Sequence, residues 1–355
     1  ALALAQLSDT ERRGALHDVA DAIEANADAI LDANETDVAE AEERLADGEY
    51  SQVLVDRLRL SASKIGDIAE MVRSVAEQSD PLGKTLSARE LDDDLELYKV
   101  AVPIGVIGTV FESRPDALVQ IAALALKSGN AVILKGGSEA SESNRALYEI
   151  IVEAVGDAVP EGWAQLIEAR EDVDTLLEMD DSVDLLMPRG SSAFVQYVQD
   201  NTSIPVLGHT EGVCHVYVDS EADLAMASDV AYDAKVQYPA VCNAVETLLV
   251  HEDVAADFLP DIAARYADAG VEIRGDEATR EIIDAEGATD EDWETEYGDL
   301  IVAVRVVDSL DAAVDHVTTH GSKHTESIVT ADADRAGRFM RAIDSASVFH
   351  NVSTR

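Results

Sequence analysis

The order of predicted strands and helices between residues 102 and 155 restricts the fold more than any other feature. An apolar run from Val106 to Phe111 predicts a buried strand, and helical spacing follows from Asp116 to Lys127. A second buried strand, Ala131 to Lys135, ends in a glycine turn and leads into a helix from Ser143 to Val155. This β-α-β-α order predicts a parallel sheet with helices on both faces.

Strands and helices continue to alternate to the end of the chain. Further strands are predicted over residues 95–102, 163–167, 183–187, 201–206, 214–219, 245–250, 300–307, 326–329 and 347–351. Helices are predicted from residue 1 to about 80 and over residues 173–178, 223–236, 255–269, 312–318 and 333–343. With 355 residues the chain is long enough for about two domains, both of the α/β class.

The net charge disfavours polyanionic partners and indicates a halophilic source. Asp and Glu number 72 against 26 Lys and Arg, which gives a formal charge of −46. Such a surface repels nucleic acid and anionic membranes, so we expect neither as a partner. Because concentrated salt screens this self-repulsion, the charge predicts a protein from a halophile.

Neither a membrane-spanning segment nor a signal peptide is expected. No apolar run approaches 18 residues, and the amino terminus lacks a basic start followed by a long apolar stretch. Two cysteines, Cys214 and Cys242, are too few for a disulfide framework. We therefore expect a cytoplasmic protein. No spacing of His and Cys forms a ligand set, so no metal site is predicted.

Cys242 lies in a loop that contains Pro239, between the predicted helix 223–236 and the strand 245–250. A thiol at such a junction is accessible to a ligand, and free backbone N–H groups lower its pKa. A cysteine taken alone is more often a small buried apolar side chain. The loop makes Cys242 a candidate nucleophile that other residues have to support.

Several cations and hydroxyl groups follow directly after predicted strands. Arg114, Lys135 and Ser138 all come at the carboxyl ends of strands, where parallel sheets bind their ligands. A helix that begins near Ser191, after Gly190, would present free N–H groups to a phosphate. In so acidic a chain, these positions indicate an anionic ligand.

Longer motifs follow one another along the chain. They are Val102-Pro-Ile-Gly-Val-Ile-Gly108 with Glu112-Ser-Arg-Pro115, Leu126-Lys-Ser-Gly-Asn-Ala-Val-Ile-Leu-Lys-Gly-Gly-Ser-Glu-Ala140, Met187-Pro-Arg-Gly190, Cys214-His-Val-Tyr-Val-Asp219, Cys242-Asn with Glu246-Thr-Leu-Leu-Val250, and Asn351-Val-Ser-Thr-Arg355. In this order they resemble the gamma-glutamyl phosphate reductase family of the aldehyde dehydrogenase superfamily. The resemblance spans essentially the whole chain.

The resemblance implies a fold and a domain division. It predicts an aldehyde dehydrogenase-like α/β fold, with a Rossmann-like NADP-binding domain over residues 1–236, including the N-terminal helices. A smaller α/β catalytic domain that carries Cys242 would occupy residues 237–355. A homo-oligomer is also implied.

The reaction implied is the second step of proline biosynthesis, in which NADPH reduces L-glutamyl 5-phosphate to L-glutamate 5-semialdehyde and phosphate. Glutamate 5-kinase would supply the substrate. The Cys242 thiolate would attack the acyl phosphate, expel phosphate and leave a thioester, which hydride from the nicotinamide would reduce. The Cys242 backbone N–H is the natural donor to the oxyanion.

Family positions imply residues that contact the substrate. Arg114 stands where other aldehyde dehydrogenases carry an oxyanion-binding asparagine, and its guanidinium would bind the leaving phosphate bidentately. An ion pair with a nearby carboxylate is the alternative for Arg114. Arg355 would pair with the glutamate α-carboxylate. The other implied substrate contacts are Asn243, Ser322, His324, Asn351 and Ser353.

Cofactor contacts are implied in the same way. Lys135, which ends a strand and precedes Gly136, Gly137 and Ser138, would receive a 2′-phosphate, which favours NADPH over NADH. Gly190 and Ser191 would lie at the phosphates. Glu296 would hold the nicotinamide ribose, although it could equally be one acid among the 72.

Departures from the family leave alternatives open. The segment 206–213 lacks the glutamate base of hydrolytic aldehyde dehydrogenases, which fits a reductase, although Glu211 lies nearby. Tyr238 replaces an expected arginine, and the chain begins inside the first family helix and ends before the glycine-rich tail. The alternatives are another acylating or aldehyde-oxidising dehydrogenase, a cysteine acyltransferase or hydrolase with His209 or His215 as base, and a nucleotide-binding regulator.

We predict that the unfolding temperature falls when the protein is moved from about 1 M to about 0.01 M KCl, because unscreened repulsion extends from about 3 Å to about 30 Å. Thermal unfolding followed by circular dichroism measures it. Sucrose of equal osmolarity should not replace the salt. The same unfolding temperature at both salt concentrations would contradict the prediction.

Overall fold

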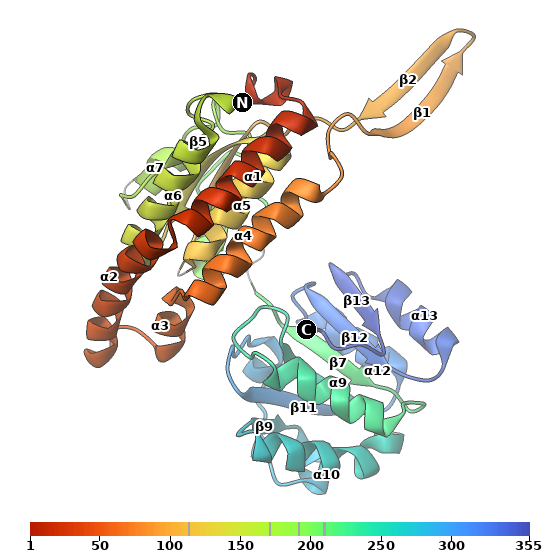
Figure 1. Ribbon diagram of the computed structural model, residues 1–355. Coiled ribbons are helices and arrows are strands. Elements are labelled where there is room, and N and C mark those ends of the chain that lie inside the picture. Colours follow the sequence, from red (N-terminus) through yellow and green to blue (C-terminus); the bar gives the residue numbers. More distant parts are fainter. Residues whose placement is uncertain (113, 170–171, 191, 209–210) are drawn as a thin grey trace. The chain divides into compact units, whose positions relative to one another are not determined.

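The computed structural model describes residues 1–112, 114–169, 172–190, 192–208 and 211–355. The chain divides into two compact units, residues 1–208 and 209–355 (Figure 1). Both units combine helices with a parallel sheet, as the sequence predicts. No helix in the described ranges is long and apolar enough to cross a membrane.

Helices form the amino-terminal part of the first unit. They are η1 (Leu4–Gln6), α1 (Asp9–Ala25), α2 (Ala27–Ala46), α3 (Gln52–Leu58) and α4 (Ala62–Glu77). Ser8 and Glu11 form a capping box at the start of α1, as their spacing predicts. Buried aliphatic side chains on α1 and α4, among them Leu16, Ile23 and Val72, pack these helices against each other.

A four-stranded parallel sheet forms the rest of the first unit's core. Its elements are β3 (Val106–Phe111), α5 (Pro115–Lys127), β4 (Ala131–Gly136), η2 (Ser138–Ala140), α6 (Ser141–Val155), η3 (Gly156–Ala158), β5 (Ala164–Leu166), α7 (Asp172–Leu177), β6 (Leu185–Pro188) and α8 (Ser192–Asp200). The strand order β5-β4-β3-β6 is that of the first four strands of a Rossmann sheet. It brings the segments after β3, β4 and β6 to one edge.

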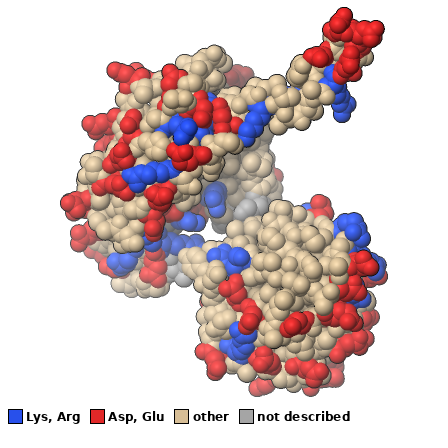
Figure 2. Space-filling view, turned by 45° about the vertical axis from the view of Figure 1, so that its right-hand side comes forward, with Lys and Arg blue, Asp and Glu red and all other residues tan. Residues whose placement is uncertain are grey.

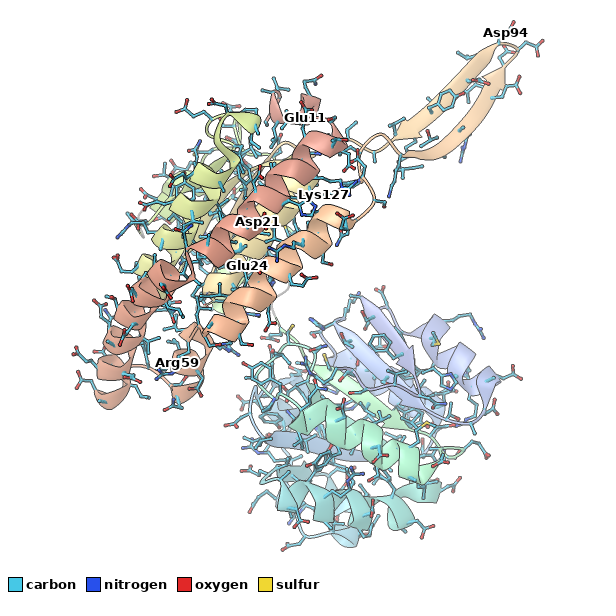
Figure 3. All side chains as sticks on the ribbon, in the orientation of Figure 1. Glu11, Asp21, Glu24, Arg59, Asp94 and Lys127 are labelled. Carbon is cyan, nitrogen blue, oxygen red and sulfur yellow. The ribbon has the colours of Figure 1, made fainter. Side chains whose placement is uncertain are left out.

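An antiparallel hairpin, β1 (Thr85–Asp92) and β2 (Leu95–Val100), belongs to the first unit, and all its residues are exposed. Asp94, at the tip, adopts a φ of 61° (Figure 3). The exposed large apolar side chains of this hairpin are Leu86, Leu91, Leu95, Leu97, Tyr98 and Val100. Only β2 was predicted, because β1 mixes polar and apolar residues without strict alternation.

The second unit is built on a seven-stranded sheet in the order β10-β9-β11-β8-β7-β12-β13, and every pairing is parallel. Its elements are β7 (Cys214–Val218), α9 (Leu224–Val236), β8 (Val245–His251), α10 (Glu252–Asp268), β9 (Glu272–Gly275), α11 (Glu277–Ile282), β10 (Glu286–Gly287), η4 (Asp290–Glu294), β11 (Ile301–Val307), α12 (Leu310–His320), β12 (Thr325–Val329), α13 (Ala333–Ala342) and β13 (Ser347–His350). Leu248 packs under α9 and α10, whereas Leu249 packs under α12 and α13. Both faces of the sheet are therefore covered.

The structure corrects two sequence predictions. The predicted domain boundary between residues 236 and 237 falls too late, because β7 pairs with β8 and β12 and α9 packs on the same sheet. The predicted strand over residues 201–206 is a loop with a single bridge from Val206 to Leu186. Pro205 has no N–H to donate to a ladder, which explains the short pairing.

Figure 2 shows acidic side chains on both units and gathered at the hairpin tip. Many arginines are held within this acidic surface. Arg73 of α4, for example, donates to Asp21 and Glu24 of α1, which are labelled in Figure 3. Exposed pairs of this kind contribute little stability each, so the excess negative charge remains to be screened by salt.

Candidate active site

Cys242 lies in the loop between α9 and β8, at the amino edge of the seven-stranded sheet. The side chain is partly exposed. Among the described residues, the Cys242 N–H has no hydrogen-bond partner, so it can donate to a ligand. A thiol and a backbone donor therefore occur on the same residue.

The residues that begin β7 hold the carbonyl group of Cys242. A Cβ on Gly212 would come within 2.0 Å of the Cys242 oxygen, so only glycine allows this approach. The Cys214 thiol donates to the same oxygen at 3.2 Å. Burial raises the pKa of Cys214 far above its usual value, which keeps this thiol neutral. This geometry gives Cys214 a structural role beside Cys242.

The same short segment binds predicted site residues from distant parts of the chain. Gly212 N–H donates to the Glu296 carboxylate at 2.9 Å, and Val213 N–H donates to Ser322 Oγ at 2.9 Å. His324 Nδ1 lies 3.7 Å from Cys214 Sγ. The structure thus brings Glu296, Ser322 and His324 together around the residues that support Cys242.

Asn243 and Arg355 fasten the other side of the loop. The Asn243 amide donates to the carbonyl oxygen of Thr354 at 2.7 Å, and the Arg355 guanidinium donates to Asn243 Oδ1. Arg355 Nε also donates to Gln237 Oε1 at 3.2 Å. Residues on both sides of Cys242 are therefore tied to residues 354 and 355.

Asn351 and Ser353 shape the segment that reaches this loop. Asn351 has a φ of 57°, and its amide exchanges hydrogen bonds with both backbone groups of Thr330. Val352 O then accepts from Ser327 Oγ, so the chain runs back beside β12. Ser353 Oγ accepts from Arg355 N–H at 3.2 Å. In this structure both side chains form a turn, and their predicted substrate contacts remain predictions.

His215, one of the bases considered in the hydrolase alternative, is fully buried, and its Nδ1 bonds to Glu326 at 2.9 Å. An imidazole held in this way inside the sheet is not placed to activate a solvent-facing thiol. His209, the other base considered, lies outside the described residues.

In the first unit, Arg114 caps the amino end of α5 and is half exposed. Its guanidinium pairs with Asp116 at 3.2 Å. The ion pair considered as an alternative is thus present. The pair is exposed and weak, so a phosphate dianion could replace it.

The glycine turn after β4 is packed closely by neighbouring side chains. Lys135 is buried, and its ammonium donates to Gly136 O at 2.6 Å. A Cβ on Gly136 would lie 2.2 Å from Asn144 Nδ2, and one on Gly137 would lie 2.1 Å from Glu139 Oε1. A Cβ at either position would displace a neighbouring side chain, so the turn is packed against Asn144 and Glu139. The predicted contacts of this turn with the cofactor remain predictions.

Carboxylates line the same edge. Glu112 lies against Gly190, where a Cβ would approach it to 3.0 Å. Partial burial and the nearby Glu139 raise the pKa of Glu112, whereas Arg57 lowers it. A phosphate at this edge would lie near both negatively and positively charged side chains. Ser191, predicted to contact the cofactor here, lies outside the described residues.

Sequence reasoning missed a fully buried ion pair beside the Cys242 loop. Lys235, in the last turn of α9, donates to Glu246 of β8 at 2.7 Å, and neither side chain is exposed. A charged residue inside the apolar strand 245–250 was the available signal, because unpaired charges are almost never fully buried.

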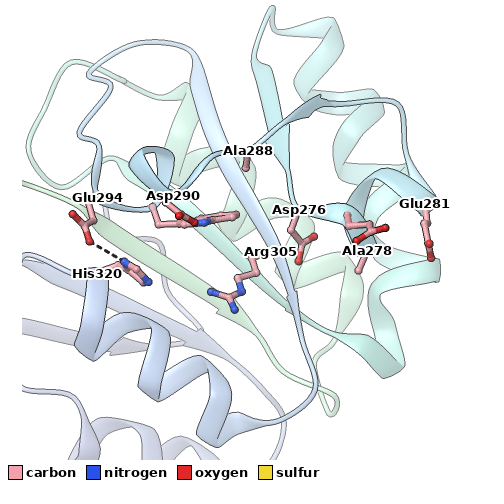
Figure 4. A pocket seen from close by; sticks show the side chains of 10 residues that line it. Asp276, Ala278, Glu281, Ala288, Asp290, Glu294, Arg305 and His320 are labelled. Atoms are coloured by element: carbon pink, nitrogen blue, oxygen red, sulfur yellow. Dashed lines mark hydrogen bonds and ion pairs between the residues drawn. The ribbon is translucent and has the colours of Figure 1, made fainter.

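A pocket of about 880 Å³ lies elsewhere in the second unit (Figure 4). Its lining contains five carboxylates beside Arg305, Trp293 and His320, and Glu294 bonds to His320 as drawn. The carboxylates are Asp276, Glu277, Glu281, Asp290 and Glu294. Their charge disfavours an anionic substrate or dinucleotide, and none of the predicted site residues lines this pocket.

Comparisons with known proteins agree with the motifs. The model of the aldehyde dehydrogenase family matches residues 2–281. Gamma-glutamyl phosphate reductases of the halophiles Natronomonas pharaonis and Haloquadratum walsbyi are 75% and 72% identical to the chain. Each match covers the whole chain, and it covers 81% and 79% of the respective relative. These sources confirm the halophilic character predicted from the charge.

A solved structure extends the comparison to the fold. The crystal structure of gamma-glutamyl phosphate reductase from Thermotoga maritima matches with a TM-score of 0.93 and 40% sequence identity. The match covers 99% of this chain and 85% of that one. The predicted aldehyde dehydrogenase-like fold is thus confirmed. With its family model, its relatives and its fold in agreement, the chain belongs to the gamma-glutamyl phosphate reductases of the aldehyde dehydrogenase family.

Proposed function

We propose that the chain reduces L-glutamyl 5-phosphate to L-glutamate 5-semialdehyde and phosphate with NADPH, through a thioester on Cys242. Support comes from relatives named for this reduction. The observation that carries the residue assignment is the loop of Cys242. Neighbouring segments hold its carbonyl group and its flanks, while the thiol is partly exposed and the N–H is unbonded among the described residues.

The first half of the reaction requires a nucleophile and an oxyanion donor. The Cys242 thiolate forms a bond to the acyl carbon, the bond from that carbon to the phosphate oxygen breaks, and phosphate leaves with the electron pair. The Cys242 N–H donates to the oxyanion that forms during attack. Contacts with Gly212 and Cys214 fix the Cys242 carbonyl and thereby restrict the backbone that carries the thiol and the N–H.

The second half needs a reductant that the chain does not itself contain. The residues proposed below, among them Lys135 and Glu296, would hold a nicotinamide cofactor, which would supply the hydride for the thioester carbonyl. When the aldehyde is released, the carbon–sulfur bond breaks and the sulfur regains its electron pair. Near Gly212, Glu296 already accepts from Gly212 N–H, and Glu211 is exposed.

Substrate and cofactor contacts are proposed from the family positions. Arg355 would bind the α-carboxylate of the glutamyl group, and Arg114 the leaving phosphate. The remaining proposed substrate contacts are Asn243, Ser322, His324, Asn351 and Ser353. Those proposed for NADP are Lys135, Gly136, Gly137, Ser138, Gly190, Ser191 and Glu296.

We also propose that the chain forms a homo-oligomer and that its substrate comes from a glutamate 5-kinase. The hairpin β1–β2 supports the oligomer. It exposes large apolar side chains on a two-stranded ribbon, which is marginally stable alone in water.

The reaction is tested in reverse, with glutamate 5-semialdehyde, NADP and phosphate in molar KCl. We expect continued NADP reduction beyond one turnover to require phosphate, which releases the thioester, and all NADP reduction to be lost in Cys242→Ala, because no thioester can form. Cys214→Ala should still reduce NADP, since that thiol makes no bond to the substrate. Reduction of NADP at the same rate without phosphate would instead indicate a hydrolytic aldehyde dehydrogenase.

Lys135→Gln tests the preference for NADP. We expect the KM for NADP to rise about tenfold, the effect of losing one charge-assisted hydrogen bond, while the KM for NAD stays nearly constant. Initial rates with each cofactor measure both constants. Lys99→Gln, on the exposed hairpin strand β2, is the control and should change neither. An equal rise for NADP and NAD would contradict a 2′-phosphate contact.

A further inference from the structure

The buried ion pair of Lys235 and Glu246 connects the two ends of the Cys242 loop. Lys235 ends α9 and Glu246 lies near the start of β8, so residues 237–244 form the loop between them. Burial raises the pKa of Glu246 to about 7 and lowers that of Lys235, while each charge favours the ionised form of the other. Such a pair is costly to bury and, by itself, is weak support for stability.

Both members of the pair also bind the segment Glu296–Asp299. Gly298 N–H donates to Glu246 Oε1 at 3.3 Å, and the Lys235 ammonium donates to Asp299 O at 3.1 Å. Gly298 has a φ of 60°, so this segment turns sharply just after Glu296. Glu246 thus accepts a hydrogen bond from this turn, and Lys235 donates one to it.

Glu296 links this segment to the residues around Cys242. Its carboxylate accepts from Gly212 N–H, and Gly212 packs directly on the Cys242 carbonyl. The segment Glu296–Asp299 is therefore bound at one end through Gly212 to the tip of the Cys242 loop. At its other end the segment is bound through the ion pair to the two ends of that loop.

We propose that Lys235 and Glu246 are positioning residues that fix the segment Glu296–Asp299 against the Cys242 loop, and thereby set the nicotinamide ribose site relative to the nucleophile. This inference rests on the roles proposed above for Cys242 and Glu296. The pair touches neither substrate nor cofactor and acts through the backbone of residues 298 and 299.

The double variant Lys235→Met with Glu246→Leu separates positioning from stability. Apolar side chains of similar volume commonly replace a buried ion pair without loss of stability. They would nevertheless remove both hydrogen bonds to the segment. We expect a folded protein whose KM for NADP rises about tenfold, while the KM for semialdehyde stays within about twofold.

A second readout does not depend on turnover. Iodoacetamide alkylates Cys242, and peptide mapping gives the rate with and without NADP. If the segment Glu296–Asp299 couples the cofactor site to Cys242, NADP changes the alkylation rate of Cys242 in the wild type. The alkylation ratio, the faster rate divided by the slower one with and without NADP, should fall about fivefold or more towards one in the double variant. A merely structural pair would leave the ratio unchanged in a folded variant.

The ion pair of Arg335 and Asp219 is the matched control. Asp219 is also buried beside the same sheet, but it follows the carboxyl end of β7, whereas Cys214 begins that strand. Arg335→Met with Asp219→Asn keeps an acceptor for one of the two hydroxyl groups that donate to Asp219, those of Tyr217 and Thr330, and the new amide N–H can donate to the other. It should lower stability without changing the KM for NADP or the alkylation ratio.

The outcomes are distinguishable from failure of the proposed reaction. A folded Lys235→Met, Glu246→Leu variant with wild-type KM for NADP and wild-type alkylation ratio overturns the positioning role. If that variant does not fold in molar KCl, the single variant Lys235→Met is measured in the same two ways. It retains Glu246, which can stay buried in its protonated, neutral form. Full phosphate-dependent activity in Cys242→Ala would refute the thioester, and yet the KM for NADP would still test the pair.

Discussion

The contact between Gly212 and the carbonyl group of Cys242 is the constraint on which the rest of the site depends. No side chain fits at residue 212, where a Cβ would lie 2.0 Å from the Cys242 oxygen. This contact brings the start of β7 against the loop before β8, at the amino edge of the sheet. The N–H groups of Gly212 and Val213 then reach Glu296 and Ser322. Ligand sites of parallel sheets usually lie at the carboxyl edge, so the position of this loop is unusual.

Electrostatics places a second constraint on the molecule. A chain of net charge −46 has to bind a substrate and a cofactor that are both anions. Its cations therefore act locally and in acidic surroundings, as Arg114 beside Asp116 and Lys135 near the Glu139 turn illustrate. Concentrated salt shortens the reach of the distant carboxylates more than that of a cation in direct contact. The halophilic surface and the anionic ligands are compatible for this reason.

Local patterns made much of the fold predictable. Apolar runs located β3, β4, β7 and β8, and the motifs identified the family and the cysteine. The boundary near residue 208 was missed because it depends on the pairing of β7 with β8 and β12, which no local pattern records. Long-range contacts also hid the ion pair of Lys235 with Glu246 and the turn at Asn351. The roles proposed for Asn351 and Ser353 came from family positions, whereas their backbone contacts required coordinates.

The most direct test of the account is to trap the intermediate. The protein is incubated with glutamate 5-semialdehyde and NADP in molar KCl without phosphate, quenched in acid, digested and analysed by mass spectrometry. Our account predicts one glutamyl group per chain, carried by Cys242 and released when phosphate is added before the quench. A glutamyl group on another residue, or reduction of NADP with no covalent adduct, would contradict it.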